Sequence, residues 1–109
     1  MASTFMADWL PGDKNGAGKA FAAAFEAKYG RETDNWAPVG YSQMMIIADA
    51  FKRIEGEPTR EKVRDALTSI KDVPVIIGDG IFSIDKKRIP HYGMSVLQVQ
   101  DGQFVAAPQ

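Results

Sequence analysis

The chain has 109 residues, of which 45% are hydrophobic and 25% are charged, and its formal net charge is −1. These values describe a globular protein of at most one ordinary domain, which buries roughly 60 to 70% of its unfolded surface. The balanced charge leaves no basic face for nucleic acid, and the absence of cysteine excludes disulfides, thiolate nucleophiles and cysteine-bound zinc.

The N-terminal segment, MASTFMADWLPG, lacks the basic and apolar regions of a signal peptide. We therefore expect either a cytosolic protein or the interior of a longer one whose first Met is introduced. Residues 3–10 fit a short strand or an irregular lead-in, and the sequence does not decide between them. The Pro-Gly-Asp sequence at residues 11–13 predicts a turn.

The first predicted helix covers residues 16–29. Asp13 or Asn15 is placed to cap its start, and Gly30 suits the left-handed conformation that ends many helices. An apolar stripe that includes Phe21 follows one side of this helix, so we expect that side to be packed.

The most apolar stretch is residues 37–54, in which Pro38 opens a central helix that ends before Gly56. Its apolar residues spread beyond one stripe, so we expect burial on more than one side. A chain of this size does not supply enough partners, and several of these side chains should stay exposed in a monomer. The candidates for exposure are Met44, Met45, Ile46, Ile47 and Phe51. We predict a homo-oligomer, most simply a dimer, whose interface is built either on the central helix or by swapped strands.

A third, amphipathic helix should follow, with Thr59 as its N-cap. After Lys71 the pattern becomes that of strands, which we predict over residues 73–77, 81–84 and 92–100. The Asp101-Gly102 pair predicts a tight type I′ turn that closes an antiparallel hairpin. The predicted fold class is α/β, with three helices followed by short strands.

Catalytic motifs are weak. Residues 12–20 resemble a phosphate-binding loop, but the first glycine position of that motif holds Asp13 and the metal-binding hydroxyl position holds Ala20. His91 is the only histidine, and Ser95 is about 13 Å away along the same predicted strand. Carboxylates are scattered singly. We predict a protein that is not an enzyme and that holds no metal or cofactor.

Tyr41 is the more informative residue. We place it in the first turn of the central helix beside Gly40, where its phenol either faces a cleft at the helix N-terminus or covers the core. A helix N-terminus favours anionic groups, so the first alternative predicts a ligand contact.

The order of these features resembles a known family. A WLPG segment, a helix that ends in KYG, a GY pair before an apolar helix, a REKVRDAL helix and a closing DG hairpin are similar to the C-terminal part of extracytoplasmic solute-binding proteins. The likeness is to the branched-chain amino acid receptors of ABC transporters and covers Trp9 to Ala106. Most of it is carried by Phe21, Tyr29-Gly30, Gly40-Tyr41, residues 63–67 and residues 98–102.

The resemblance implies a fragment of a two-lobed, type I periplasmic binding protein, which clamps a small organic solute such as an amino acid between its lobes. Residues 1–109 would be one truncated unit, in which residues 9–82 belong mainly to one lobe and residues 83–109 cross to the other. The implied partner is a membrane permease, and the implied location is periplasmic or extracellular.

The candidate ligand-binding residues are Tyr41, Ser42 and Trp9. Ser42 stands where family members usually carry an acid after the GY pair, which leaves the solute undetermined. The alternative is a small self-contained α+β module for interaction or oligomerisation.

Overall fold

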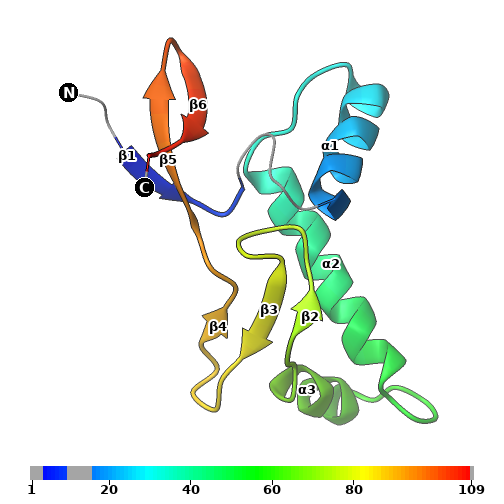
Figure 1. Ribbon diagram of the computed structural model, residues 1–109. Helices are drawn as coiled ribbons and strands as arrows, with labels where there is room; N and C mark the ends of the chain where they lie inside the picture. The colour runs from blue at the N-terminus through cyan, green and yellow to red at the C-terminus, as the bar shows by residue number, and fades with distance from the viewer. Residues whose placement is uncertain (1–3, 10–15, 109) are drawn as a thin grey trace.

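The structure of the protein is a computed structural model that describes residues 4–9 and 16–108. The turn predicted at residues 11–13 and the cap predicted at Asp13 or Asn15 lie outside the described residues. Within them the chain forms three helices and six short strands (Figure 1). In chain order these are β1 (Thr4–Ala7), α1 (Gly16–Tyr29), α2 (Trp36–Lys52), α3 (Arg60–Thr68), β2 (Val73–Pro74), β3 (Ile81–Ile84), β4 (Pro90–His91), β5 (Ser95–Gln100) and β6 (Gln103–Ala106).

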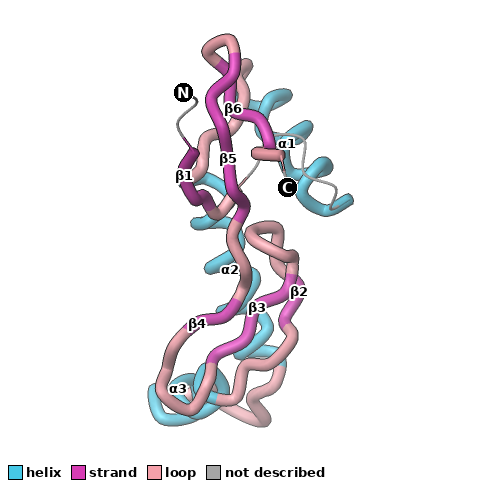
Figure 2. The backbone as a smooth tube through the Cα atoms, turned by 60° about the vertical axis from the view of Figure 1, so that its left-hand side comes forward, coloured by secondary structure: helices cyan, strands magenta, loops and turns pink. Residues whose placement is uncertain are grey.

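Two separate antiparallel sheets lie at opposite ends of an extended molecule, and α2 runs alongside (Figure 1). One sheet has the order β1-β5-β6, with Met6 opposite Val96 and Val99 opposite Phe104. The other has the order β2-β3-β4. Figure 2 shows the chain passing from β4 in the second sheet directly into β5 in the first.

The predicted hairpin is confirmed. Asp101 and Gly102 both have positive φ, 51° and 77°, as a type I′ turn requires, and β5 and β6 pair on either side of them. The structure also decides the open question at the N-terminus, because β1 is a strand that pairs with β5. Its partner lies about ninety residues further along the chain, a pairing that local sequence patterns do not reveal.

Two predicted strands are too long. The strand predicted over residues 73–77 ends at Pro74, because Val75 donates its N–H to the Gly80 carbonyl and Ile76 donates to the Ser42 side chain instead of a ladder. The strand predicted over residues 92–100 begins only at Ser95, since Gly93 has a φ of 73° and separates it from β4.

The helices follow their local signals closely. Helix α1 has the predicted bounds, and Gly30 at a φ of 67° donates its N–H to Glu26 at its end. Thr59 caps α3 by accepting a hydrogen bond from the Lys62 N–H, as predicted. Helix α2 begins at Trp36, two residues before Pro38, because Asp34 accepts hydrogen bonds from the first backbone N–H groups.

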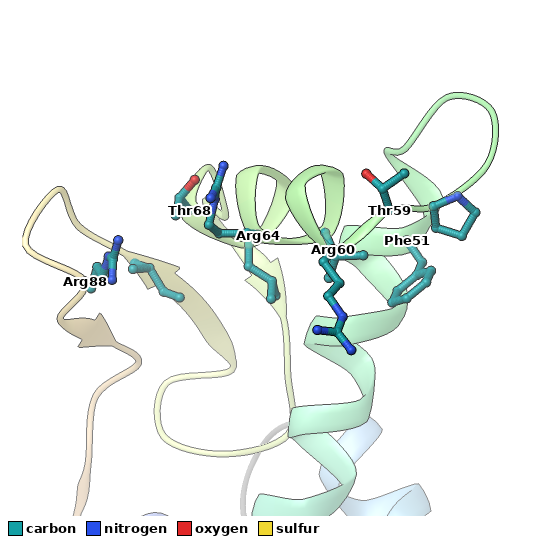
Figure 3. Close-up of a pocket in the computed structure, with 10 residues that line it drawn as sticks. Phe51, Thr59, Arg60, Arg64, Thr68 and Arg88 are labelled. Atoms are coloured by element: carbon teal, nitrogen blue, oxygen red, sulfur yellow. The ribbon is translucent and has the colours of Figure 1, made fainter.

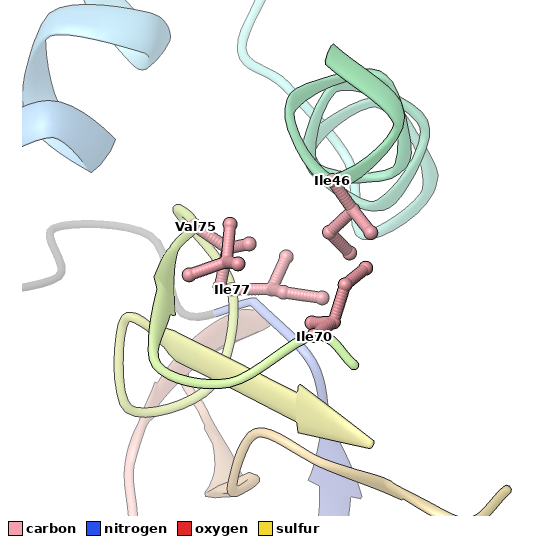
Figure 4. Close-up of a cluster of buried hydrophobic side chains, with 5 residues drawn as sticks. Ile46, Ile70, Val75 and Ile77 are labelled. Atoms are coloured by element: carbon pink, nitrogen blue, oxygen red, sulfur yellow. The ribbon is translucent and has the colours of Figure 1, made fainter. Parts of the chain in front are cut away.

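The core lies between α2 and the loop that follows β2 (Figure 4). It consists of Ile46, Ile70, Val73, Val75 and Ile77, with Val39, Leu67, Phe82 and Tyr92 packed around it. Helix α2 contributes a single buried face, which carries Pro38, Ser42, Ile46 and Ala50. These residues are four apart and so lie on one side of the helix.

The expectation that α2 is buried on more than one side is wrong for this chain, whereas the expected exposure of its other apolar residues is confirmed. Met44 is 63% exposed and Phe51 is 45% exposed, and Ile47 is also exposed; Ile46 is buried and Met45 is half-buried. The second sheet packs on the inner side of α2 only, and the outer side is covered only in part, by Phe21 of α1 against Tyr41 and by α3 beside Phe51.

The molecule has more surface than its size predicts. Its accessible surface is 7973 Å², whereas about 6000 Å² is typical for a folded monomer of this mass. Its radius of gyration is 16.1 Å, against about 13 Å for a compact chain of this length. The excess of about 2000 Å² is comparable with the area that stable protein interfaces bury.

Candidate functional site

Two segments connect the first sheet to the rest of the chain: Asp8–Trp9, which follow β1, and residues 92–94, which join β4 to β5; we call them the crossing segments. One hydrogen bond joins these two crossing segments, and a second joins the first segment to Gly78 in the turn before β3. The Tyr92 hydroxyl donates to Asp8 Oδ1 at 2.8 Å, and the Gly78 N–H donates to the Asp8 carbonyl at 2.9 Å. The bond to the Asp8 carboxylate is the main reason that the pKa of Tyr92 lies above its usual value. One acidic residue thus holds both crossings together.

Asn35 fixes the same place from the loop between α1 and α2. Its Oδ1 accepts hydrogen bonds from the backbone N–H groups of Asp8 and Trp9, each at 3.1 Å, and its Nδ2 donates to Asp8 Oδ2 at 3.4 Å. The neighbouring Asp34 accepts from the N–H groups of Trp36 and Ala37 at the start of α2. The Ala37 bond is the largest cause that lowers the pKa of Asp34.

A cavity of about 630 Å³ opens where β1, the β5–β6 hairpin and this loop meet. We call it the crossing pocket, and its lining residues are Met6, Ala7, Asp8, Trp9, Glu32, Thr33, Asp34, Asn35, Trp36, Leu97 and Phe104. The lining combines aromatic and aliphatic side chains with three carboxylates, and among the described residues it includes no lysine or arginine. Such a surface suits a ligand with an apolar body and a cationic group.

The two tryptophans of the pocket differ in their surroundings. Trp36, the first residue of α2, is 75% exposed, whereas Trp9 is only 3% exposed. The Trp9 Nε1–H is buried and has no hydrogen-bond partner among the described residues. Buried indole N–H groups usually have an acceptor, so Trp9 brings an unused donor to the lining of this pocket.

The structure brings two of the three sequence-predicted site residues into one aromatic cluster. Phe21 of α1 contacts Trp9 edge to face at a centroid distance of 6.1 Å and Tyr41 at 4.9 Å. Tyr41 remains half-exposed. The sequence predicts it in the first turn of the central helix. It lies in the second turn of α2 because the helix begins before Pro38.

Ser42 is placed differently. It is fully buried, on the face of α2 that meets the core, and its Oγ accepts a hydrogen bond of 3.3 Å from the Ile76 N–H. Its hydroxyl therefore holds the irregular loop after β2 against the helix.

Sequence reasoning did not find four residues of this site: Asp8, Asn35, Trp36 and Tyr92. The only local signal was the Asp-Asn pair ahead of the central helix, since Asp and Asn are typical helix caps. Asp8 meets partners 27 and 84 positions away, and no local pattern encodes such pairs.

His91 forms a separate, exposed pair with Asp85, whose Oδ2 is 3.0 Å from His91 Nε2. This bond is the largest of the causes that lower the pKa of Asp85. Within residues 4–9 and 16–108, no hydroxyl group forms a hydrogen bond with His91 in the structure, so the pair lacks the nucleophile of a catalytic triad. The same residues contain no cluster of three or more His, Asp or Glu side chains suited to a metal ion.

Comparison with known proteins identifies the family. The profile described as periplasmic binding protein matches residues 2–103, which is nearly the whole chain. The chain belongs to the periplasmic binding protein family. Its predicted resemblance to branched-chain amino acid receptors and its predicted α/β fold class are both confirmed. Among the curated proteins, none matches the chain.

Solved structures agree with this assignment. A protein from Rhodospirillum rubrum, described as a branched-chain amino acid ABC transporter, is 27% identical with a TM-score of 0.78 over 95% of this chain. A leucine binding protein from Thermotoga maritima is 24% identical with a TM-score of 0.81 over 98% of this chain. An ABC transporter substrate-binding protein from Desulfitobacterium hafniense, in complex with Leu, is 18% identical with a TM-score of 0.80 over 95%. The last two show the likeness of fold alone.

This periplasmic binding protein chain spans 30% of the length of each of these three relatives. No helix within its described residues is both long enough and apolar enough to cross a membrane.

Proposed function

We propose that the chain forms part of a solute receptor and that the crossing pocket is part of its ligand cleft. The observation that carries this proposal is the position of the pocket at the crossing segment Asp8–Trp9, between the first sheet and the loop that leads into α2. In a receptor whose lobes close on the ligand, a site at the connection between the lobes changes shape when they move.

The lining favours an amino acid with an apolar side chain. Glu32 and Asp8 supply negative charge for the ammonium group, and Trp36 and Phe104 supply apolar surface for the side chain. Trp9 contributes its unpaired N–H, which suits the ligand carboxylate. Tyr41 contacts the ligand or its neighbours from the edge of the same aromatic cluster. We assign Ser42 to positioning the loop beneath that cluster.

The rest of the receptor follows from the same proposal. Residues 9–82 belong to one lobe, and residues 83–109 lead into the second lobe, where β1 and the terminal hairpin form one sheet. Closure of the lobes on a solute presents the receptor to a membrane permease, in the periplasm or outside the cell. The family and the relatives with amino acid transport descriptions support these assignments.

Both tryptophans of the chain line the crossing pocket, so their fluorescence reports its occupancy. We expect millimolar leucine to change the emission saturably. We expect 4-methylpentanoate, which has the same apolar body and carboxylate but no ammonium group, to have a much weaker effect. Replacement of Glu32 by Gln should weaken leucine binding severalfold.

The matched control is Glu26→Gln on the exposed surface of α1, which removes the same charge outside the pocket. An emission that does not respond to leucine would refute the assignment of the pocket. An equal response to leucine and 4-methylpentanoate would refute the role of the carboxylates.

The exposed side of α2 favours a second proposal, that the isolated chain forms a homo-oligomer. Tyr41, Met44, Ala48 and Phe51 follow one another at intervals of three and four residues, which is the spacing of a helix-pairing seam. Light scattering on a gel-filtration column tests it, with Met44→Glu as the disrupting variant. A wild-type chain that remains monomeric at high micromolar concentration would contradict it, and would leave the self-contained module as the alternative.

A further inference from the structure

A second cavity, remote from the crossing pocket, carries positive charge on an otherwise acidic chain. It has a volume of about 640 Å³ and lies between α3, the end of α2 and the turn that joins β3 to β4 (Figure 3). Its lining includes three arginines, Arg60, Arg64 and Arg88, and no aspartate or glutamate from the part of the chain that the structure describes. The chain as a whole has a net charge of −1, so this concentration of positive charge is local. We call it the arginine groove.

The floor of the groove is apolar. It is formed by Phe51 of α2, Val63 and Leu67 of α3, and Ile84 of β3. Phe51 is 45% exposed, so a large part of its side chain is open to a ligand in the groove. An apolar floor with a basic rim is complementary to a ligand that has an apolar ridge flanked by anionic groups.

The guanidinium groups are available to such a ligand. Among the described residues, the side chains of Arg60 and Arg88 form no hydrogen bond or ion pair in the structure, and Arg64 pairs only with its neighbour Asp65 at 3.2 Å. That pair is exposed on both sides and so is weak. Arginine binds carboxylates through two parallel hydrogen bonds, which a lysine cannot do.

Local structure holds the arginines in place. Arg88 has a φ of 64°, a conformation that few residues other than glycine adopt, and its turn is fixed by Asp85, which accepts hydrogen bonds from the N–H groups of Lys87 and Ile89. Arg60 is the first residue of α3, where the helix dipole disfavours a cation. Arg88 and Arg60 therefore both occupy positions that disfavour an arginine, and both lie at the rim of the same groove.

From this geometry we infer that the arginine groove binds an acidic amphipathic helix of a partner protein. Arg60 and Arg64 are one turn apart, about 6 Å along α3, and Arg88 faces the groove from the opposite element. Carboxylates one turn apart on a helix match this arrangement, while their apolar neighbours rest on Phe51. A small anion with a single carboxylate would engage only part of the rim.

A second copy of this chain is a poorer occupant. The carboxylates of α3, Glu61 and Asp65, have only polar residues and Pro58 at three or four positions along the helix. That side of α3 therefore has no apolar ridge to enter the groove of another copy. The inference concerns a different surface from the crossing pocket and does not depend on the solute site proposed there, but it shares Phe51 with the helix-pairing seam, so the partner helix and a second copy would compete for that residue.

The test measures binding of a fluorescein-labelled amphipathic peptide to the 109-residue chain by fluorescence anisotropy. The peptide carries a leucine stripe flanked by glutamates one turn apart, and its control carries glutamine at every glutamate position. We expect saturable binding of the glutamate peptide only, weakened by added salt. Arg60→Gln and Arg88→Gln should each weaken it about two- to fivefold.

Two matched variants complete the test. Arg31→Gln removes the same charge at a site where the guanidinium lies 5.1 Å from the Phe25 ring, outside the groove, and should leave binding unchanged. Phe51→Ser keeps every charge and should weaken binding through the lost apolar contact.

The inference is overturned by equal binding of the two peptides, or by arginine variants that bind like the wild type. It is also overturned if the groove binds laurate but not the peptide, because the site is then one for a small amphiphile. Sedimentation of the chain alone tests whether a second copy occupies the groove. A dimer that is lost in Arg60→Gln would assign the groove to a second copy and overturn the inference.

Discussion

Replacement of Ser42 by alanine removes one oxygen atom from the interior and should destabilise the fold. Ser42 is fully buried, and its Oγ is the acceptor for the N–H of Ile76, which is 1% exposed. Leaving such a buried donor unpaired costs about 1 to 3 kcal/mol. Alanine regains up to about 0.5 kcal/mol as the better helix former. We therefore expect a net loss of about 1 to 2 kcal/mol, and a melting temperature lower by about 4 to 8 °C for each kcal/mol.

The assay is urea unfolding followed by circular dichroism, with Gln43→Ala as the matched control. Gln43 is the next residue of α2 and is exposed, so its replacement changes helix propensity to a similar extent without removing a buried partner. A Ser42→Ala variant as stable as Gln43→Ala would refute the reasoning, because the loop at Ile76 would then not depend on this hydroxyl.

Three further predictions concern other parts of the chain. Gly78→Ala would place a Cβ against the carbonyl oxygens of Tyr92 and Gly93 and should cost more than about 3 kcal/mol in chemical unfolding, whereas Gly30→Ala, also at positive φ but in open space, should cost about 1 kcal/mol. Asn35→Ala leaves two backbone donors without their acceptor and should cost about 2 kcal/mol, against an unchanged stability for Gln43→Ala. The hydrogen bond from His91 lowers the pKa of Asp85, so Asp85 stabilises the fold above its ordinary pKa of 3.8. This stabilisation is lost as the pH falls below that value. In thermal melts, the melting temperature of Asp85→Asn should therefore fall less steeply with acid than that of the wild type.

Local chemistry accounts for the parts of the fold that could be predicted. The caps at Gly30 and Thr59 and the turn at Asp101-Gly102 depend on a few adjacent residues, and the structure places each as its sequence indicates. The lengths of the strands depend also on residues that are distant in the sequence. Residues 75–77 have the composition of a strand, but the Ser42 hydroxyl on α2 supplies the hydrogen-bond acceptor that a neighbouring strand would otherwise provide.

The crossing pocket was outside the reach of sequence patterns for the same reason. Trp9 and Tyr41 were selected, and both lie in the aromatic cluster around Phe21. The residues that organise the pocket, Asp8 and Asn35, are polar groups whose partners are fixed only once β1 and α2 have been brought together. A pattern of apolar spacing says nothing about such pairs.

The pairing of β1 with β5 has a consequence for the order in which the chain folds. During synthesis β1 is made well before β5, because all three helices lie between the two strands in the sequence. Closing so long a loop is entropically unfavourable until other contacts have shortened it. The helices and the second sheet, whose contacts are nearer in sequence, should therefore form during translation, while β1 stays unpaired until β5 has been made.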